Sequence, residues 1–286
     1  MPSGLESSAA SFGTRIADRG LPARTVENRK ALRDDRASAH NERKALTMKL
    51  VLHVGLAAAL GGLTFVARAE TRSGSPATQD RKLVVVERFQ SQGCSSCPPA
   101  QDNLNALADR PDVLALSFAV TYWDYLGWKD RFVSPKFTAR QWDYAHRNGF
   151  GQVATPQAWI NGRTTINGGN RRELETAIAS ARGGAGPSLA LSGNKLTIGA
   201  GQAPTGRADV WLVRYDPRTV HVAIRAGENG GRTLPHRDIV RELVRIGRWT
   251  GAPLTLAVSS SSANGLKSAV LVQGVSGGSI IAALRV

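Results

Sequence analysis

Hydrophobic residues in the middle of the chain alternate between strand-like and helix-like spacing. Leu83–Phe89 is a β-branched run of strand length, apolar residues recur at helical spacing from Ala100 to Ala108, and Val113–Val120 repeats the strand pattern. This order predicts a β-α-β unit. The same reasoning predicts three further features downstream: a helix opening at Ser134-Pro135, a hairpin around Asn161-Gly162, and a helix over 171–182 that Asn170 caps.

The last hundred residues change to short runs of period two. They predict a hairpin around Gly193-Asn194, a second turn at Asp216-Pro217, and strands at 254–258, 269–273 and 280–286. Between them, 237–248 fits either a helix or a strand. Its apolar residues fall on one helical face and four arginines on the other, which favours a helix. We therefore expect an α/β domain at 82–184 and a smaller β-rich, sandwich-like domain at 187–286.

The N-terminal region has the pattern of an export signal behind an upstream extension. Residues 1–47 are polar and lack apolar periodicity, so we expect a disordered, non-native extension. From Met48 a short basic start, an apolar stretch and the sequence Ala67-Arg68-Ala69 form a signal peptide pattern, with cleavage near Ala69. The alternative is an uncleaved membrane anchor. Cleavage predicts a periplasmic or secreted protein.

Charge and cysteine content narrow the function classes. The 286 residues carry a formal net charge of +15 with 42% hydrophobic residues, which excludes a disordered polyelectrolyte. Residues 1–69 hold eleven basic and six acidic residues, so the remainder carries +10. In an exported protein this excess favours weak contact with anionic envelope surfaces, or plain arginine-rich composition, over nucleic-acid binding. Two cysteines are too few for a disulfide framework.

These two cysteines form a Cys-x-x-Cys motif at the first strand-to-helix turn. Cys94 stands just before the predicted helix N-terminus, where free N–H groups and the helix dipole favour an anion. Cys97, one turn on, could resolve a mixed disulfide. Two alternatives remain. A structural disulfide closing so short a loop would remove less than ~2 kcal/mol of unfolded-state entropy. A metal half-site would need further ligands, for which the processed chain offers His146, His221 and His236 besides carboxylates.

Several segments together resemble a known family. They are Val84–Pro99, Tyr122–Asp130, Thr155-Pro156-Gln157, Asn161-Gly162 and Gly227–Arg232. As a set, they are similar to the exported thioredoxin-like bacterial proteins of domain of unknown function 1223. The resemblance implies a thioredoxin-like fold for the first domain, export, and a cis proline facing the dithiol at Pro156, with Thr155 and Pro156 supporting a substrate strand. It names no established substrate. The chain departs from the family at Ala119 and Thr121, where His and Asp are common.

Three other residues are candidates near the dithiol. Glu87 shares one face of the first strand with apolar residues, so it either shuttles a proton to Cys97 or pairs with Arg88 or another arginine. Trp123 and Trp128 belong to an aromatic-rich segment that either forms a wall binding an apolar peptide or packs as local core.

The predicted function is thiol–disulfide exchange on exported proteins that carry thiols or disulfides. Cys94, Cys97 and Glu87 are the predicted catalytic residues, and Thr155, Pro156, Trp123 and Trp128 the predicted substrate-binding residues. No organic cofactor, metal or nucleic acid is expected. The alternative is a non-catalytic envelope binding module, or a metal-handling (copper) protein, that uses the same cysteines.

Overall fold

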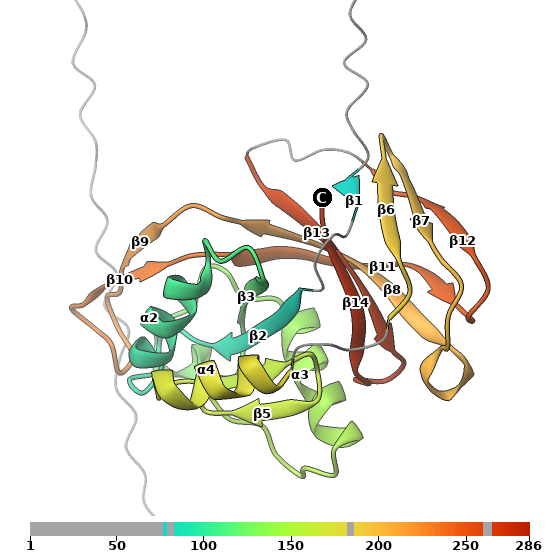
Figure 1. The fold of residues 1–286 in the computed structure, drawn as a ribbon. Coiled ribbons are helices and arrows are strands. Elements are labelled where there is room, and N and C mark those ends of the chain that lie inside the picture. Colours follow the sequence, from blue (N-terminus) through green and yellow to red (C-terminus); the bar gives the residue numbers. More distant parts are fainter. Residues whose placement is uncertain (1–76, 79–82, 182–185, 260–264) are drawn as a thin grey trace, which may run out of the picture. The chain divides into compact units, whose positions relative to one another are not determined.

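The computed structural model describes residues 77–78, 83–181, 186–259 and 265–286, which belong to one compact unit. The predicted upstream extension and signal peptide lie outside these residues. Within them, no helix combines the length and apolar character needed to cross a membrane. Figure 1 shows the chain, whose first half contains β1 (Ala77–Thr78), β2 (Val84–Gln90), α2 (Pro98–Leu107), β3 (Val113–Ala119), the 3-10 turn η1 (Asp124–Leu126), α3 (Pro135–Arg147), β4 (Gln157–Ile160), β5 (Thr164–Ile166) and α4 (Arg171–Ser180).

Local pattern correctly predicted the first-half helices and the strands from β2 to β5. Prolines open α2 and α3, and the Ser134 side chain accepts a hydrogen bond from the Lys136 N–H at the start of α3. The Asn170 carboxamide oxygen accepts from the N–H groups of Arg172 and Glu173, which begins α4 as expected. The predicted β-α-β unit is therefore confirmed, with β2 and β3 parallel.

The second half is almost entirely strand. Its elements are β6 (Leu189–Ser192), β7 (Lys195–Ile198), the 3-10 turn η2 (Pro204–Gly206), β8 (Ala208–Asp216), β9 (Val220–Ala223), β10 (Thr233–His236), β11 (Ile239–Trp249), β12 (Leu254–Ala257), β13 (Lys267–Gly274) and β14 (Ile280–Arg285). The predicted helix at 237–248 is wrong, because β11 occupies it. The predicted turn at Asp216-Pro217 separates β8 from β9, but these two strands do not pair with each other: β8 pairs with β11 and β13, and β9 pairs with β10.

The strands of both halves form one mixed sheet, in the order β14-β13-β8-β11-β3-β2-β4-β5. The join lies where β11 runs parallel to β3, with Ile239 opposite Ser117 and the Ser117 N–H bonded to the Asp238 carbonyl at 2.8 Å. The predicted thioredoxin-like α/β domain followed by a sandwich-like β domain is therefore wrong. An eight-stranded sheet with three α-helices in the described residues replaces it, because β3 offered an unpaired edge that β11 covers.

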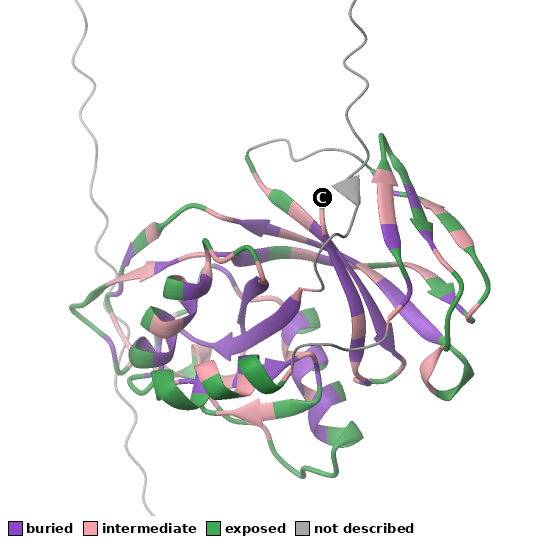
Figure 2. Cartoon of the chain, in the orientation of Figure 1, coloured by how far each residue is buried: buried purple, intermediate pink, exposed green. Residues whose placement is uncertain are grey.

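Side chains on the two faces of this sheet form separate cores. One face packs against α3 through Phe89, Phe118 and Tyr144, and the same cluster continues into β8 and β13. The other face is covered by α2 and α4 over β2 and β3, and by the smaller sheet β1-β6-β7-β12 over β8, β13 and β14. Figure 2 shows these buried residues running along the large sheet. Successive residues of β2 therefore face different cores.

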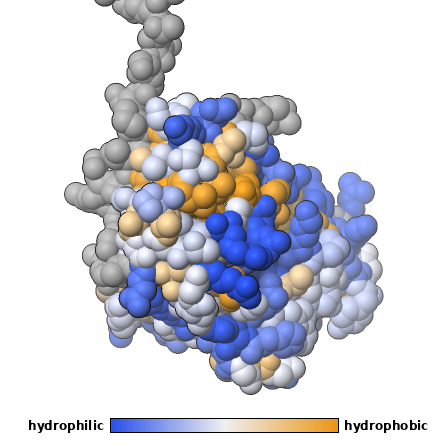
Figure 3. All heavy atoms as spheres, turned by 90° about the vertical axis from the view of Figure 1, so that its right-hand side faces the viewer, coloured by the Kyte–Doolittle hydropathy of each residue, from blue (hydrophilic) through white to orange (hydrophobic). Residues whose placement is uncertain are grey.

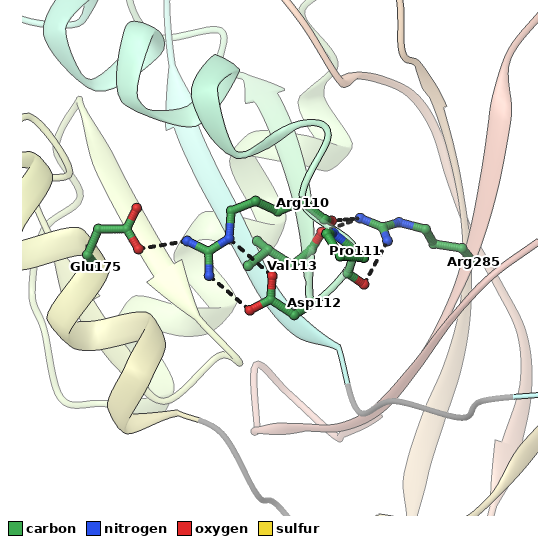
Figure 4. A network of polar contacts seen from close by, with 6 residues as sticks. All are labelled: Arg110, Pro111, Asp112, Val113, Glu175 and Arg285. Carbon is green, nitrogen blue, oxygen red and sulfur yellow. Dashed lines mark hydrogen bonds and ion pairs between the residues drawn. The ribbon is translucent and has the colours of Figure 1, made fainter.

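A polar network fastens the loop after α2 to elements on either side of it (Figure 4). Arg110 pairs with Asp112 at 2.9 Å and with Glu175 of α4 at 2.6 Å. Arg285, at the end of β14, donates to the carbonyl oxygens of Arg110, Pro111 and Val113. These bonds tie the C-terminal strand to the β-α-β unit.

The side of the molecule that carries β6, β7 and β12 is partly apolar. Figure 3 shows apolar side chains gathered in a band there, among polar neighbours. In the β-rich half, a cavity of about 440 Å³ is lined by the apolar side chains of Leu212, Val244 and Ile246 and by the charged pair Arg214 and Glu242. The second half thus has a surface hollow of its own.

Candidate functional site

The two cysteines are bonded to each other at the N-terminus of α2. Their Cα atoms are 5.5 Å apart, and Cys97 is the residue that precedes the first helical turn. The predicted position at a strand-to-helix turn is confirmed. Helix N-termini present free N–H groups and a positive dipole end, so this place favours a thiolate when the bond is reduced. Both cysteines are buried, at 0% and 2% exposure, whereas Ser95 and Ser96 between them are exposed.

A loop from the β-rich half holds this turn from the side. We call residues 227–232, between β9 and β10, the clamp loop. The buried Asn229 donates through Nδ2 to the carbonyl oxygens of Gln92 at 3.0 Å and Cys94 at 2.7 Å. Arg232 donates to the Asn229 side-chain oxygen at 2.8 Å, which orients the amide. Gly227 lies directly against Gly93. The dithiol turn is therefore built by both halves of the chain.

Glu228 of the clamp loop bonds the exposed side of the same turn. Its carboxylate accepts from the Ser95 N–H at 2.9 Å and from the Ser95 hydroxyl at 2.8 Å, while its own N–H donates to the Gly93 carbonyl at 3.2 Å. The hydrogen bond from the Ser95 backbone lowers the pKa of Glu228. The ionised Glu228 carboxylate thus accepts the hydrogen bond of the backbone N–H group one residue after Cys94.

Thr155 and Pro156 lie beside the dithiol turn, as the resemblance implied. The Ser96 hydroxyl is 3.5 Å from the Thr155 carbonyl oxygen, and the Thr155–Pro156 peptide bond is cis. Pro156 is buried, and the Thr155 hydroxyl is buried without a partner among the described residues. The structure therefore brings Cys94, Cys97, Thr155 and Pro156 together at this turn.

The aromatic segment packs beneath the turn. The Trp128 indole N–H donates to the Gln92 side-chain oxygen at 2.9 Å, and Trp123 lies beside Gly93, half-buried. Asp130 accepts from the backbone N–H groups of Gln92 and Phe132, each at 2.9 Å. Burial raises the pKa of Asp130 to about 6. Trp123 and Trp128 thus support the dithiol turn, and their remaining surface flanks it.

Glu87 is fully buried on the other face of the sheet from α2. Its carboxylate forms a two-bond ion pair with Arg140 of α3, at 2.8 and 3.1 Å, and accepts a short hydrogen bond from the Tyr144 hydroxyl. Of the two interpretations of Glu87, the structure shows the one in which it pairs with a neighbouring arginine. It does not place Glu87 with the cysteines.

The residue next to Glu87 faces the dithiol side instead. Arg88 is buried beneath α2, where it donates to the side-chain oxygen of Gln101 and to the Ser117 hydroxyl at 3.1 Å. The same Gln101 oxygen lies 3.0 Å from His236 Nδ1. Because that oxygen only accepts, His236 carries its proton on Nδ1. Burial lowers the pKa of His236 to about 3 and that of Arg88 to about 9.

Comparison with known families identifies the chain. The family described as "Protein of unknown function (DUF1223)" matches residues 85–273. The chain belongs to this family. The match spans both the dithiol turn and the clamp loop, so the family unit includes both halves of the site.

Solved structures add one informative relative of this DUF1223 chain. A crystal structure of a protein from Agrobacterium tumefaciens is 31% identical, covers 73% of this chain and 95% of its own, and has a TM-score of 0.61. HBP35 of Porphyromonas gingivalis is 12% identical over 72% of this chain and 75% of its own, with a TM-score of 0.44. No curated protein sequence matches.

Sequence reasoning missed several residues of the DUF1223 site. Asn229 and Glu228 were visible only as part of a Gly-rich stretch, and no local pattern connects them with Cys94 more than 130 positions away. Arg88, Gln101 and His236 carried no motif. The sequence did contain one indication of Arg88: the period of two in the β2 strand sends the side chains of Arg88 and Glu87 to opposite faces of the sheet. Among the described residues, no three His, Cys, Asp or Glu side chains gather at metal-binding distance.

Proposed function

We propose that this DUF1223 protein is a thiol–disulfide oxidoreductase that acts on exported proteins through Cys94 and Cys97. The observation that carries the proposal is the bonded cysteine pair at the N-terminus of α2, with Thr155 beside it. A helix N-terminus stabilises the thiolate that exchange requires. The signal peptide pattern at 48–69 supports an exported location, where protein disulfides persist.

The exchange proceeds in two balanced steps. A substrate thiolate attacks the Cys94 sulfur, a mixed disulfide forms, and Cys97 leaves as a thiolate. A second substrate thiolate then attacks the substrate sulfur of the mixed disulfide, and Cys94 leaves as a thiolate. The substrate has lost two electrons and two protons, and the protein dithiol has gained the electrons. The reverse sequence reduces a substrate disulfide.

Substrate access in this proposal runs along the exposed side of the turn. Ser95 and Ser96 are exposed, and an extended substrate segment laid along them and the adjacent Thr155 would approach the bond between the cysteines. Because Cys94 itself is buried, attack requires a small displacement of the clamp loop or of the 154–156 segment. The flanking surfaces of Trp123 and Trp128 then contact apolar substrate side chains.

One observation favours a second candidate, a binding module with an inert disulfide. Both cysteines are at most 2% exposed, and the clamp loop makes four hydrogen bonds to the backbone of the turn and one to the Ser95 hydroxyl. Catalytic disulfides need an accessible sulfur. In this candidate the bond keeps the turn in shape, and the β-rich half recognises an envelope partner.

A redox titration separates these candidates. The purified chain is equilibrated in glutathione or dithiothreitol buffers beside Cys94→Ser and Cys97→Ser, and its metal content is measured. A reversible potential between about −120 and −270 mV, together with exchange on a reduced peptide, supports the oxidoreductase. A potential well below about −300 mV identifies an inert bond, and stoichiometric metal identifies a metal-handling protein; either result overturns the proposal.

A further inference from the structure

Arg88 is a buried cation whose hydrogen bonds are incomplete. Its side chain is 1% exposed, and only Nη2 has partners, in Gln101 and Ser117. Its Nε and Nη1 atoms are buried without a partner among the described residues. No carboxylate of these residues forms an ion pair with it. Buried charges are normally paired and hydrogen-bonded, so among the described residues this guanidinium has neither an ion-pair partner in contact with it nor a full set of acceptors in the oxidised protein.

Two carboxylates, Asp130 and Asp102, attract the Arg88 charge through space but do not bond it. Asp130 interacts with Arg88 only through space, and both of its oxygens accept backbone N–H bonds from Gln92 and Phe132. Burial also favours the neutral form of Asp130. Glu87, the neighbour of Arg88 in β2, lies on the opposite face and pairs with Arg140.

The position of Arg88 relates it to the dithiol. Arg88 lies on the face of β2 that α2 covers, and its guanidinium bonds the Gln101 side chain in the second turn of that helix. The Gln101 N–H in turn donates to the Cys97 carbonyl at 3.0 Å. The cation therefore lies under the N-terminal part of α2, which carries the cysteines. Its effect on them is electrostatic and not through direct contact.

We propose that Arg88 stabilises the thiolate released on reduction of the Cys94–Cys97 bond, and so makes the pair a disulfide donor toward substrates that carry free thiols. Reduction adds two electrons and one proton to the bond and leaves one thiol and one thiolate. The thiolate adds a negative charge at the N-terminus of α2, the helix beneath which the incompletely bonded Arg88 guanidinium lies. Stabilising the reduced form makes a dithiol more oxidising. The inference deepens the proposed function, because it requires that the pair be reducible and assigns reduced polypeptides as the substrate class.

The test compares reduction potentials of matched variants in glutathione buffers. Arg88→Met keeps the length of the side chain and removes its charge, and Arg88→Lys keeps the charge. The control is Glu87→Leu with Arg140→Met, which removes a buried arginine from the other face of the same sheet. We expect Arg88→Met to lower the equilibrium constant for oxidising glutathione by about tenfold, a shift of about 30 mV. Arg88→Lys should keep most of the wild-type value, and the control should keep all of it.

A second measurement needs no variant. Thiolate absorbance near 240 nm, followed against pH in the reduced wild-type protein, should give a thiol pKa at least one unit below the ~8.5 of a free cysteine. A smaller shift overturns the inference, as does an Arg88→Met potential within twofold of wild type in equilibrium constant. If Arg88→Met does not fold, the reduction potential of Arg88→Gln and this titration of the wild-type protein test the inference in its place. A shifted potential without any exchange on peptides would refute the proposed function and the substrate class, and would leave standing only the stabilisation of the thiolate by Arg88. Exchange with an unshifted potential would support the proposed function and refute the role of Arg88.

Discussion

The ion pair between Glu87 and Arg140 gives the sharpest test of the assignment of Glu87 to the core. We consider Glu87→Gln, which keeps the shape of the side chain and removes its charge. In the wild type the carboxylate accepts three hydrogen bonds, two from Arg140 and one from Tyr144. Both partners of the ion pair are at most 5% exposed. The variant leaves the Arg140 guanidinium buried without its counter-charge.

The expected loss follows from that burial. Removing one partner of a buried ion pair costs about 3–5 kcal/mol, against about 5–15 kcal/mol of total stability for a typical domain. For a chain of this size, the loss corresponds to a fall of about 6–20 °C in the melting temperature. Replacing both partners, in Glu87→Leu with Arg140→Met, should recover much of the loss. Recovery should be incomplete, because the Arg140 guanidinium also lies over the rings of Phe118 and Trp211.

Urea unfolding of the oxidised protein, followed by tryptophan fluorescence, measures these differences. The same variants are then titrated in redox buffers across pH 5 to 9. Because Glu87 lies on the face away from α2, we expect Glu87→Gln to leave the pH dependence of dithiol oxidation unchanged. A stability loss below about 1 kcal/mol would refute the ion-pair reasoning. A changed pH profile in the folded variant would restore the proton-shuttle role.

Two further predictions concern the clamp loop and a buried acid. Gly227 and Gly231 both have positive φ, so alanine costs about 1–2 kcal/mol at either position. A Cβ added at Gly227 would lie 3.3 Å from the Gly93 Cα atom, whereas one added at Gly231 would meet nothing within 4 Å. Gly227→Ala should therefore also displace the dithiol turn and raise the alkylation rate of the reduced cysteines. Equal alkylation rates in Gly227→Ala and Gly231→Ala would contradict this. Burial raises the pKa of Asp238 to about 7, despite the facing charges of Arg237, Lys267 and Arg285. Its unfolded value is about 3.9, so the folded state binds the extra proton and stability falls as pH rises from about 4 to about 7, by up to about 4 kcal/mol. Asp238→Asn, tolerated at φ +49°, should flatten that fall in urea unfolding at pH 5 and 8, and an unchanged slope would assign it to other groups.

The strand β11 shows why periodicity misjudged one element. Its pairing with β8 contains register shifts between Val240 and Glu242 and between Arg245 and Gly247. Each bulge adds a residue, so Ile239, Val240 and Leu243 are all buried in place of a strict alternation. Two bulges in eleven residues imitate the spacing of a helical face. The arginines that looked like its polar face instead meet Asp109, Asp209 and the Phe132 ring.

The larger error, two domains in place of one sheet, has a different physical origin. Local patterns predicted the strands β2 to β5 of the first half and most strands of the second, but strand pairing depends on which edges remain open. Ile239 and Ser117 are more than 120 positions apart, and nothing in either segment indicates the other. The same long separation hid the clamp loop, because Asn229 reaches Cys94 only when β9 and β10 extend past α2 (Figure 1). Elements follow from local sequence, whereas a site assembled between distant segments does not.

The chemistry of the site depends on the alternation of a single strand. Glu87 and Arg88 are neighbours in β2, and the period of two sends them to opposite faces. Sequence alone could show that Glu87 joins the apolar set of Val85 and Phe89, which the core containing α3 confirms. It could not show which face α2 covers, because that depends on the handedness of the connection and on the packing of α3. Once α2 is placed over Val84 and Val86, the charged β2 residue beneath this helix is Arg88 and not Glu87. A Glu87 carboxyl there would store a proton for the thiols; the Arg88 cation favours their ionised form, and so predicts a more oxidising pair.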